Sequence, residues 1–399
     1  MPKLLLALLI LVPVGAGTFF TLPNLLDRQM NSVAAPPPYP ASDQAKQLHQ
    51  RLFVADLHDD ALLWQRDLLE RHDYGHSDLP RLLEGRVGLQ VFSTVTKTPR
   101  GINYESNGAD SDNITLLAMA QRWPRETWSS LLARALYQAD KLQQAAAASD
   151  GKLVLIHNRG ELARYLEDWQ RDPQRLATVL ATEGLQPIEG KLENLDRLYD
   201  AGFRIAGLTH FFDNEVGGSA HGLVKGGLTP LGRQVIARLE EKRMLVDLAH
   251  ASKPLIDDVL AIAKRPVLVS HTGVAGTCPG PRNLTDDQFR KILAQTQVGP
   301  QGISLLRGQD MGLIARYPPA DLPAAQVGAK IYSHELADIV ASGVLDRVFH
   351  PLRTGDGQER IKRLLDSGQA SYIRSDELGV LNTFSRLYIR QKQNTVFEI

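Results

Sequence analysis

The sequence predicts an α/β protein folded as a (β/α)8 barrel of the TIM type, and three observations carry this prediction. Short runs that are almost wholly apolar, such as Leu153–Ile156 and Val267–Val269, are typical of parallel strands buried on both faces. Helical segments alternate with these runs, as they do in a βα architecture. The chain has 399 residues, and a barrel of this kind typically needs ~250 residues and accepts long insertions.

Composition excludes several other classes. Lys and Arg together number 45, as do Asp and Glu, so the balance of charge gives no support for a nucleic-acid partner. The single cysteine, Cys278, rules out a disulfide within the chain and a zinc site built from several thiolates. Any metal ion must therefore be held by histidine and carboxylate side chains.

The N-terminal segment, residues 1–30, is expected to form a transmembrane helix. Leu4 to Leu26 carry no charge, and this run exceeds the roughly 20 residues that span the core of a bilayer. A cleaved signal peptide is the alternative, but Val14-Gly15-Ala16 is a poor cleavage site and the apolar run continues past it. We therefore favour an uncleaved anchor. Lys3 in front of the run indicates that the following domain is exported to the periplasm or another extracytoplasmic space.

Residues 31–45 are expected to be a proline-rich linker. The prolines Pro36-Pro37-Pro38 and Pro40 stiffen this stretch, so we expect a spacer that lifts the domain off the membrane. The barrel is assigned to residues 46–295 and a divergent C-terminal region to residues 296–399.

Strands and helices are expected to alternate through the barrel. The predicted strands are Phe53–Leu57, Val87–Ser93, Leu153–Ile156, Leu176–Ala181, Phe203–His210, Met244–His250 and Pro266–His271. Two helix starts carry capping signals, Asp78 before Pro80 and Thr229 before Pro230. The glycine-rich loop at 217–227 either lets backbone approach a ligand or is a plain connector.

The first strand runs directly into a His-x-Asp pair. Because side chains alternate along an extended chain, His58 and Asp60 face the same side near the strand's end. An imidazole nitrogen and a carboxylate oxygen at this spacing suit a metal such as zinc. A hydrogen-bonded structural histidine is the alternative, and this pair alone does not decide between them.

Other predicted strands end in residues of the same kind. These residues are Glu183, His210, His250 and His271. Three successive strands ending in histidine are hard to attribute to chance, and strand ends converge at one face of a barrel, where active sites lie. Six ligands exceed the four positions around one zinc and suit two metal ions ~3.5–4 Å apart. Such a pair indicates hydrolysis of an amide or ester by a metal-bound hydroxide.

At these residues the sequence resembles the renal-type membrane dipeptidases, zinc metallopeptidases with an amidohydrolase-like barrel. The matching stretches are Asp56-Leu57-His58-Asp59-Asp60, Thr182-Glu183-Gly184, Leu208-Thr209-His210, Asp247-Leu248-Ala249-His250, Ser270-His271 and Pro281-Arg282-Asn283-Leu284-Thr285-Asp286-Asp287. They run from about residue 50 to about residue 294 and keep the family's order and spacing.

The resemblance implies a role for each matching residue. His58 and Asp60 would hold one zinc, His250 and His271 the other, and Glu183 would bridge the two. In the same family pattern, His210 would stabilise the tetrahedral intermediate. Arg282 would bind the terminal carboxylate of the substrate, a role that suits its bidentate fork; a surface arginine in a loop is the alternative.

The resemblance stops at about Leu293. The family's last strand should end in a Gly-Ser-Asp-Phe-Asp-Gly-like turn whose first Asp acts as the acid/base or binds the substrate's amino group, and residues 298–399 contain no such turn. Asp346 and Asp356 are the nearby carboxylates, and neither is assigned this role. Either this quarter has diverged or the reading frame has shifted near residue 295, and the abrupt change favours the shift.

The sequence as a whole therefore predicts a membrane-anchored zinc dipeptidase with two Zn²⁺ ions, which hydrolyses dipeptides through a metal-bridging hydroxide. Two alternatives stay open. One is another binuclear hydrolase, such as an amidase, lactonase or phosphoesterase. The other is a membrane-anchored homologue with impaired catalysis that binds metal or a partner. Oligomeric state is left open between a monomer and a homodimer.

Overall fold

The structure is a computed structural model. It describes residues 17–33, 41–50, 52–276 and 280–295, together with four short strands between residues 313 and 398. The two carboxylates named in the last quarter, Asp346 and Asp356, lie outside the described residues, as do residues 1–16 of the predicted anchor.

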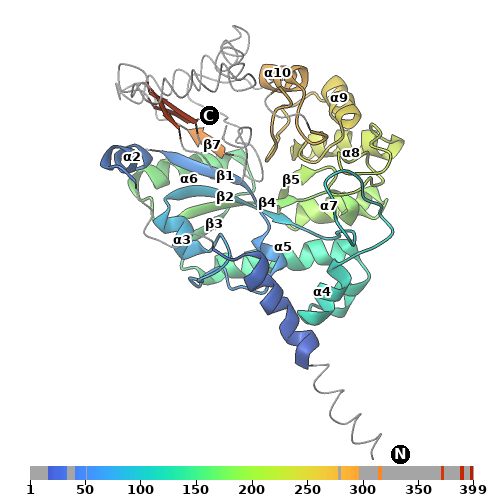
Figure 1. Cartoon of the computed structure of the whole chain (residues 1–399), viewed down its shortest axis with the longest axis horizontal. Helices are drawn as coiled ribbons and strands as arrows, with labels where there is room; N and C mark the ends of the chain where they lie inside the picture. Colours follow the sequence, from blue (N-terminus) through green and yellow to red (C-terminus); the bar gives the residue numbers. More distant parts are fainter. Residues whose placement is uncertain are drawn as a thin grey trace, which may run out of the picture.

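A curled, mainly parallel sheet forms the centre of the domain (Figure 1). Its strands are β1 (Phe53–Asp59), β2 (Val87–Thr94), β3 (Leu153–Leu155), β4 (Leu176–Thr182), β5 (Phe203–Gly207), β6 (Leu245–Asp247) and β7 (Leu313–Arg316). They follow the order β6-β5-β4-β2-β1-β7. A parallel bridge from Asp247 to Leu268 continues this order beyond β6. The arrangement is the wall of a half-barrel, consistent with the predicted TIM-like architecture.

Strand β3 lies outside the main strand order of this sheet. The prediction placed it third in the barrel, but β2 pairs directly with β4, from Leu89↔Ala177 to Thr94↔Thr182. β3 pairs only with the first half of β4, and β5 pairs with the second half. Three residues are too few to extend β3 to the edge where the predicted ligands lie.

The edge of the wall at β1 is occupied by a strand from the last quarter of the chain. β7 pairs antiparallel with β1, from Phe53↔Arg316 to Asp56↔Leu313. A closed barrel would place a parallel strand at this edge, so the pairing departs from the predicted (β/α)8 topology. Strands β8 (Ala370–Tyr372), β9 (Leu387–Arg390) and β10 (Val396–Glu398) form a separate antiparallel sheet.

Helices connect the parallel strands, much as the sequence predicts. They are α2 (Asp43–His49), α3 (Leu79–Glu84), α4 (Ile114–Ala120), α5 (Leu131–Ala148), α6 (Arg159–Arg171), α7 (Leu192–Asp200), α8 (Pro230–Glu241), α9 (Lys253–Ile262) and α10 (Asp286–Gln295), with short 3-10 turns η1 (Ala61–Leu63), η2 (Arg125–Trp128) and η3 (Gln186–Ile188). Both predicted caps are confirmed, because Asp78 accepts a hydrogen bond from Arg81 N and Thr229 accepts one from Gly232 N.

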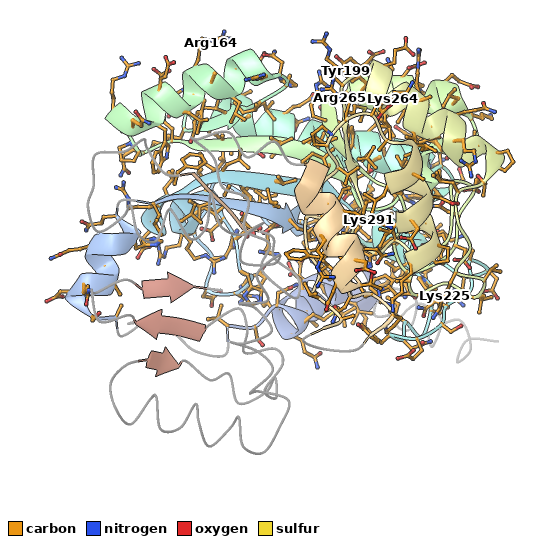
Figure 2. All side chains as sticks on the ribbon, turned by 90° about the horizontal axis from the view of Figure 1, so that it is seen from above. Arg164, Tyr199, Lys225, Lys264, Arg265 and Lys291 are labelled. Atoms are coloured by element: carbon orange, nitrogen blue, oxygen red, sulfur yellow. The ribbon has the colours of Figure 1, made fainter. Side chains whose placement is uncertain are left out.

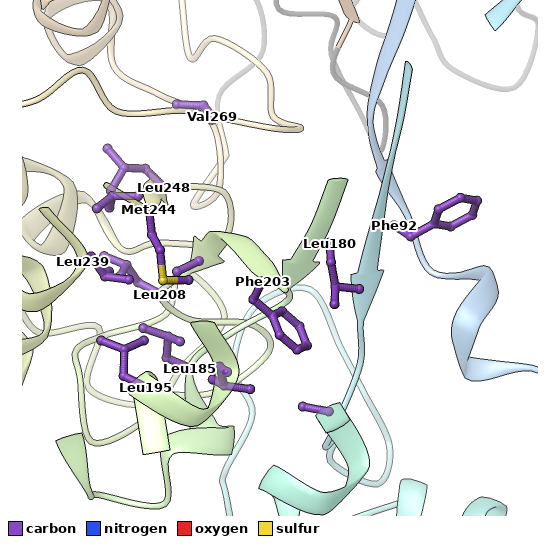
Figure 3. Packing of buried hydrophobic residues seen from close by; sticks show 14 of the residues in the cluster. Phe92, Leu180, Leu185, Leu195, Phe203, Leu208, Leu239, Met244, Leu248 and Val269 are labelled. Atoms are coloured by element: carbon purple, nitrogen blue, oxygen red, sulfur yellow. The ribbon is translucent and has the colours of Figure 1, made fainter. Parts of the chain in front are cut away.

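Hydrophobic residues cover both faces of the sheet, as expected for parallel strands. The larger cluster packs α5, α7, α8 and α9 against the strands through residues such as Phe92, Leu180 and Phe203 (Figure 3). A second cluster joins the other face to Tyr165 and Trp169 of α6. Exposed charged side chains, such as Arg164 of α6 and Lys264 and Arg265 in the bend after α9, point outward (Figure 2). The apolar packing fixes the strands, and with them the residues at their ends.

An N-terminal helix, residues 17–30, docks on this domain beside α4 (Figure 1). Its Asp27 is 3% exposed and pairs with Arg66 at 3.0 Å. This pair joins the helix to the domain by a buried contact, while the linker expected at residues 31–45 lies partly outside the described residues and stays a prediction. Among the residues described, no helix is long and apolar enough to cross a bilayer.

Gly207 ends β5 beside the backbone that follows β4, with no room for a side chain. A Cβ at this position would lie 2.6 Å from Thr182 O and 3.6 Å from the Cα of Glu183. We expect Gly207→Ala to lower the free energy of unfolding by about 1–3 kcal/mol, because a backbone carbonyl cannot move aside as a flexible side chain can. Gly226→Ala is the matched control, since the nearest atom to its Cβ would be 3.9 Å away. Urea denaturation of both variants gives the measurement, and equal midpoints would contradict this account of the β4–β5 contact.

Candidate metal centre

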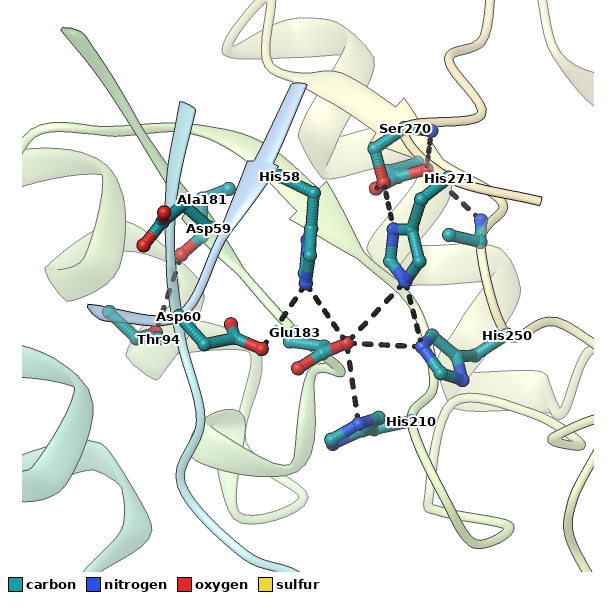
Figure 4. Close-up of polar contacts among 12 residues, drawn as sticks. His58, Asp59, Asp60, Thr94, Ala181, Glu183, His210, His250, Ser270 and His271 are labelled. Carbon is teal, nitrogen blue, oxygen red and sulfur yellow. Dashed lines mark hydrogen bonds and ion pairs between the residues drawn. The ribbon is translucent and has the colours of Figure 1, made fainter. Parts of the chain in front are cut away.

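All of the predicted strand-end ligands meet at one edge of the sheet. His58 belongs to β1, and Asp60 comes directly after that strand. Glu183 directly follows β4, and His210, His250 and His271 follow the next three parallel segments in order. Because these segments run parallel in one sheet, with β2 between β1 and β4, their C-terminal ends bring the side chains to the same place (Figure 4).

One oxygen of Glu183 is the centre of the cluster. The distances from its Oε1 to the Nε2 atoms of His250, His210, His58 and His271 are 3.0, 3.3, 3.4 and 3.7 Å. The carboxylate of Asp60 adds a second acid, with Oδ2 at 3.3 Å from His58 Nε2. His250 and His271 bring their Nε2 atoms within 3.0 Å of each other.

This donor set fits metal ions. Imidazole nitrogens and carboxylate oxygens without thiolates are ligands that zinc accepts. Glu183 Oε2 and Asp60 Oδ1 are buried without a hydrogen-bond partner, which is costly unless a ligand supplies one. Two groups with ligand atoms close enough to share an ion are His58–Glu183–His271 and Glu183–His210–His250. Glu183 belongs to both, as a bridging carboxylate would.

The grouping of histidines differs from the expected one. The family pattern pairs His250 with His271 and gives His210 no ion, whereas the groups join His58 with His271 and His210 with His250. The rings of His58 and His271 stack at 3.9 Å between centroids. All four imidazoles share one carboxylate oxygen, so distance alone does not divide them between two ions, and the assignment of each histidine stays a prediction.

The electrostatics favour neutral imidazoles at three of the four positions. Burial, reinforced by neighbouring cationic groups, lowers the pKa of His250 and His271 well below the usual value and lowers that of His210 to about 3. His58 is the exception. Burial opposes its charged form, but the charges of Asp60 and Glu183 outweigh burial and raise the pKa of His58 to about 10. Burial and the charge of Asp60 also raise the pKa of the Glu183 carboxyl.

A second layer of side chains orients His271. Asp247 at the end of β6 accepts hydrogen bonds from Ser270 N at 2.9 Å and from the Ser270 hydroxyl. Ser270 Oγ, having donated its proton to Asp247, accepts from His271 Nδ1 at 2.8 Å. This chain places the His271 proton on Nδ1 and leaves its Nε2 lone pair facing Glu183. The sequence shows Asp247 and Ser270 beside histidines, but their contact across strands appears only in the structure.

The glycine-rich loop at 217–227 supports the backbone of two other histidines of the cluster, His210 and His250. His250 adopts a left-handed conformation with φ +61°, and its carbonyl accepts from Ala220 N at 2.7 Å and Thr209 Oγ1 at 3.2 Å. Ser219 of the loop donates to the carbonyl of His210. The loop is thus a structural support for the site rather than a plain connector.

Arg282 and His221 complete the surroundings. Arg282 Nη2 donates to His250 Nε2 at 3.0 Å, so the predicted carboxylate-binding residue does reach the cluster. The sequence did not single out His221, which is 1% exposed and lies 5.3 Å from the His250 ring between centroids. Its Nδ1 lies 2.6 Å from Tyr104 O. Its position within the glycine-rich loop, away from any strand end, gave no signal of this placement.

Comparison with known proteins places these features in a family. The model of the membrane dipeptidases, peptidase family M19, matches residues 42–298. Dipeptidase aclJ of Aspergillus oryzae is 27% identical over 266 residues, which cover 62% of this chain and 56% of that protein. An uncharacterised dipeptidase of Schizosaccharomyces pombe is 27% identical over 246 residues, with 60% and 54% covered. The chain thus spans about half the length of the curated relatives it matches.

A solved structure supports the fold. The probable dipeptidase PvdM from Pseudomonas aeruginosa aligns with a TM-score of 0.51 and 18% identity, covering 63% of this chain and 60% of that one. At this identity the likeness concerns the fold alone.

The Asp247–Ser270–His271 chain predicts a measurable loss of metal affinity. We expect Asp247→Asn and Ser270→Ala each to weaken metal binding roughly 10–100-fold, because His271 would no longer be held with its lone pair inward. Titration with zinc against a competing chelator gives the affinities. Ser106→Ala, at an exposed position, should bind metal as the parent does. Unchanged affinity in both site variants would contradict the orienting role.

Metal uptake should release protons and weaken as the pH falls. Because the raised pKa of His58 keeps this group protonated at neutral pH, an entering ion must displace its proton. Calorimetric titrations with zinc in two buffers of different ionisation enthalpy measure the protons released. We expect more than zero protons per chain at pH 7, and fewer in His58→Gln. A heat that does not depend on the buffer would show that His58 is already neutral.

Proposed function

The chain belongs to the membrane dipeptidase family, peptidase family M19, and from this premise we propose that it is a zinc-dependent dipeptidase that hydrolyses the peptide bond of dipeptides. The observation that carries the proposal is the convergence of four imidazoles on Glu183 beside Asp60. The family relationship favours a peptide substrate over the ester or phosphoester of another binuclear hydrolase.

The proposed cofactor is a pair of zinc ions. Glu183 would bridge them, and His58, Asp60, His250 and His271 would complete the ligand set, with His210 close to the same oxygen. When bound, the ions supply a water of lowered pKa and polarise the scissile carbonyl. His210 would lie beside the carbonyl oxygen of the substrate and stabilise the charge that develops on it, as the family pattern implies.

Arg282 would fix the carboxylate end of the dipeptide. Its guanidinium lies against His250 and the carbonyl of His271, so a carboxylate bound there would sit next to the zinc ligands. A charge-assisted, bidentate pair would position the peptide bond over the metal pair. Binding a free terminal carboxylate so close to the zinc ligands would restrict the enzyme to very short peptides.

We also propose two features that concern the whole protein. The parallel segments would form part of a (β/α)8 barrel whose C-terminal quarter is atypical or incomplete, in keeping with the antiparallel pairing of β7 with β1. The uncharged sequence Leu4–Leu26 would attach the enzyme to a membrane with its catalytic domain exported.

Dipeptide hydrolysis by the zinc-loaded protein tests the function. We expect turnover of small dipeptides, and in Arg282→Met a loss of roughly 10–100-fold in kcat/KM, because a charge-assisted hydrogen bond contributes about 1.5–3 kcal/mol. The variant should also lose its preference for a dipeptide over the same dipeptide amide. Arg290→Met, which removes an exposed arginine of α10 paired with Asp287, is the matched control and should keep the parent rate.

The opposite results discriminate between the alternatives. Metal binding without turnover of any dipeptide would favour the impaired homologue. Turnover of esters or phosphoesters in preference to dipeptides would favour another binuclear hydrolase.

A further inference from the structure

The N-terminal helix, residues 17–30, has its polar and apolar sides the wrong way round for a helix packed on a soluble domain. Its buried positions are Pro23 and the charged residue Asp27. Its outward positions carry large apolar side chains: Phe19 37%, Phe20 39%, Leu22 44%, Leu25 61%, Leu26 38% and Met30 69% exposed. These six are half of the twelve exposed large hydrophobic residues in the described part of the chain. A helix that only served the domain would bury this side.

The helix contacts the domain through a buried ion pair between Asp27 and Arg66, which we call the lock. Asp27 Oδ2 accepts from Arg66 Nε at 3.0 Å, with 4% and 5% of the two side chains exposed. Asp27 Oδ1 accepts from Asn31 Nδ2 at 2.7 Å, and Asn31 O accepts from Gly75 N at 2.6 Å. A side chain at Gly75 would collide with the Arg66 guanidinium. The charges of Asp27 and Arg66 are both removed from water, and each would be left buried without a partner if the helix moved. The pair therefore holds the helix in one orientation.

The lock lies close in sequence to the metal centre. Arg66 follows η1, the turn that begins immediately after Asp60. Lys141 of α5 holds this turn by donating to Leu62 O at 2.7 Å and to Trp64 O. The helix is therefore attached to the segment that carries the first two predicted zinc ligands.

We propose that residues 17–30 lie in the headgroup and outer acyl layer of a membrane, and that the Asp27–Arg66 pair fixes the catalytic domain directly on that surface in one orientation. The proposal rests on the membrane attachment proposed above and adds where the membrane ends and how the domain is held to it. The enzyme would then be a surface-docked unit rather than a domain on a flexible tether.

The sequence favours lipid over a protein partner as the molecule that covers the exposed apolar side of helix 17–30. The exposed apolar side chains continue an uncharged run that starts at Leu4, so the same stretch of chain that would enter the bilayer also bears the uncovered surface. Arg28 lies two residues after the end of this run at Leu26 and 4.2 Å from the Tyr74 ring, with its ion pair to Asp73 exposed to solvent. A cation and an aromatic ring at the end of an apolar helix are typical of the membrane–water boundary.

Depth-dependent quenching tests the location of the helix. In a Cys278→Ser background, an environment-sensitive fluorophore is attached to the full chain at Leu25→Cys or Met30→Cys, or at Val224→Cys, an 82% exposed apolar position on a loop of the domain. The protein is reconstituted into vesicles of phosphatidylethanolamine and phosphatidylglycerol with spin-labelled acyl chains. We expect strong quenching at positions 25 and 30 and little at 224.

Each other outcome has a distinct meaning. The protein could bind vesicles while aqueous iodide quenches the labels at 25 and 30 as strongly as the label at 224. That result overturns this inference and leaves the proposed membrane attachment unaffected. Failure to bind vesicles at all overturns both. Cross-linking through position 25 into dimers without lipid shows that a second copy covers the surface, and also overturns the inference.

Cutting the linker tests the lock. A protease site replacing residues 34–38 is cleaved in vesicle-bound protein. If the lock holds, the cut domain stays with the vesicles on sedimentation. Asp27→Ala should release most of it, whereas Asp73→Ala, which breaks an exposed pair of the same helix, should not. A thermal melt of each uncut variant verifies folding, and equal release from both variants would refute the lock.

Discussion

A single buried carboxylate oxygen, Glu183 Oε1, is the point on which the geometry of the site depends. Four imidazole nitrogens from four different strand ends lie within 3.7 Å of it. No local segment could gather them, since the histidines span residues 58 to 271. Only a parallel sheet whose strands all end at the same edge brings these groups together, and the apolar packing on both sides of that sheet is what keeps the edge in register.

Holding so many polar groups out of water needs support from the rest of the fold. Asp247 and Ser270 orient His271, and the glycine-rich loop satisfies the carbonyls of His210 and His250. The left-handed backbone of His250 is a strained conformation, and such strain is typically retained where function requires it. Glu183 Oε2 and Asp60 Oδ1 are buried without a hydrogen-bond partner, and the histidine and carboxylate groups around them could hold metal ions. The arrangement is therefore best understood as a site built for metal.

The two ends of the chain bear on this centre in different ways. The N-terminal helix is connected to the metal centre through the Asp27–Arg66 pair and the turn that follows Asp60. The membrane-attached helix and the catalytic residues would therefore be held in a fixed relative position. At the other edge, β7 covers β1 in the antiparallel sense. A sheet edge left bare would expose unpaired backbone groups, and β7 supplies partners for part of it without closing a barrel.

The sequence by itself determined the α/β class of fold, the alternation of strands and helices along the chain and the seven residues expected at the site, because strand periodicity and strand-end residue types are local properties. Asp78 and Thr229 were predictable as caps for the same reason. Only the tertiary structure decided that β3 stands outside the wall, that Asp247 supports His271 through Ser270, and that His221 lies against His250. It also decided that Asp27 turns inward to Arg66 while its apolar neighbours face outward. These outcomes depend on which distant segments come into contact, and a linear pattern of residue types carries no record of such contacts.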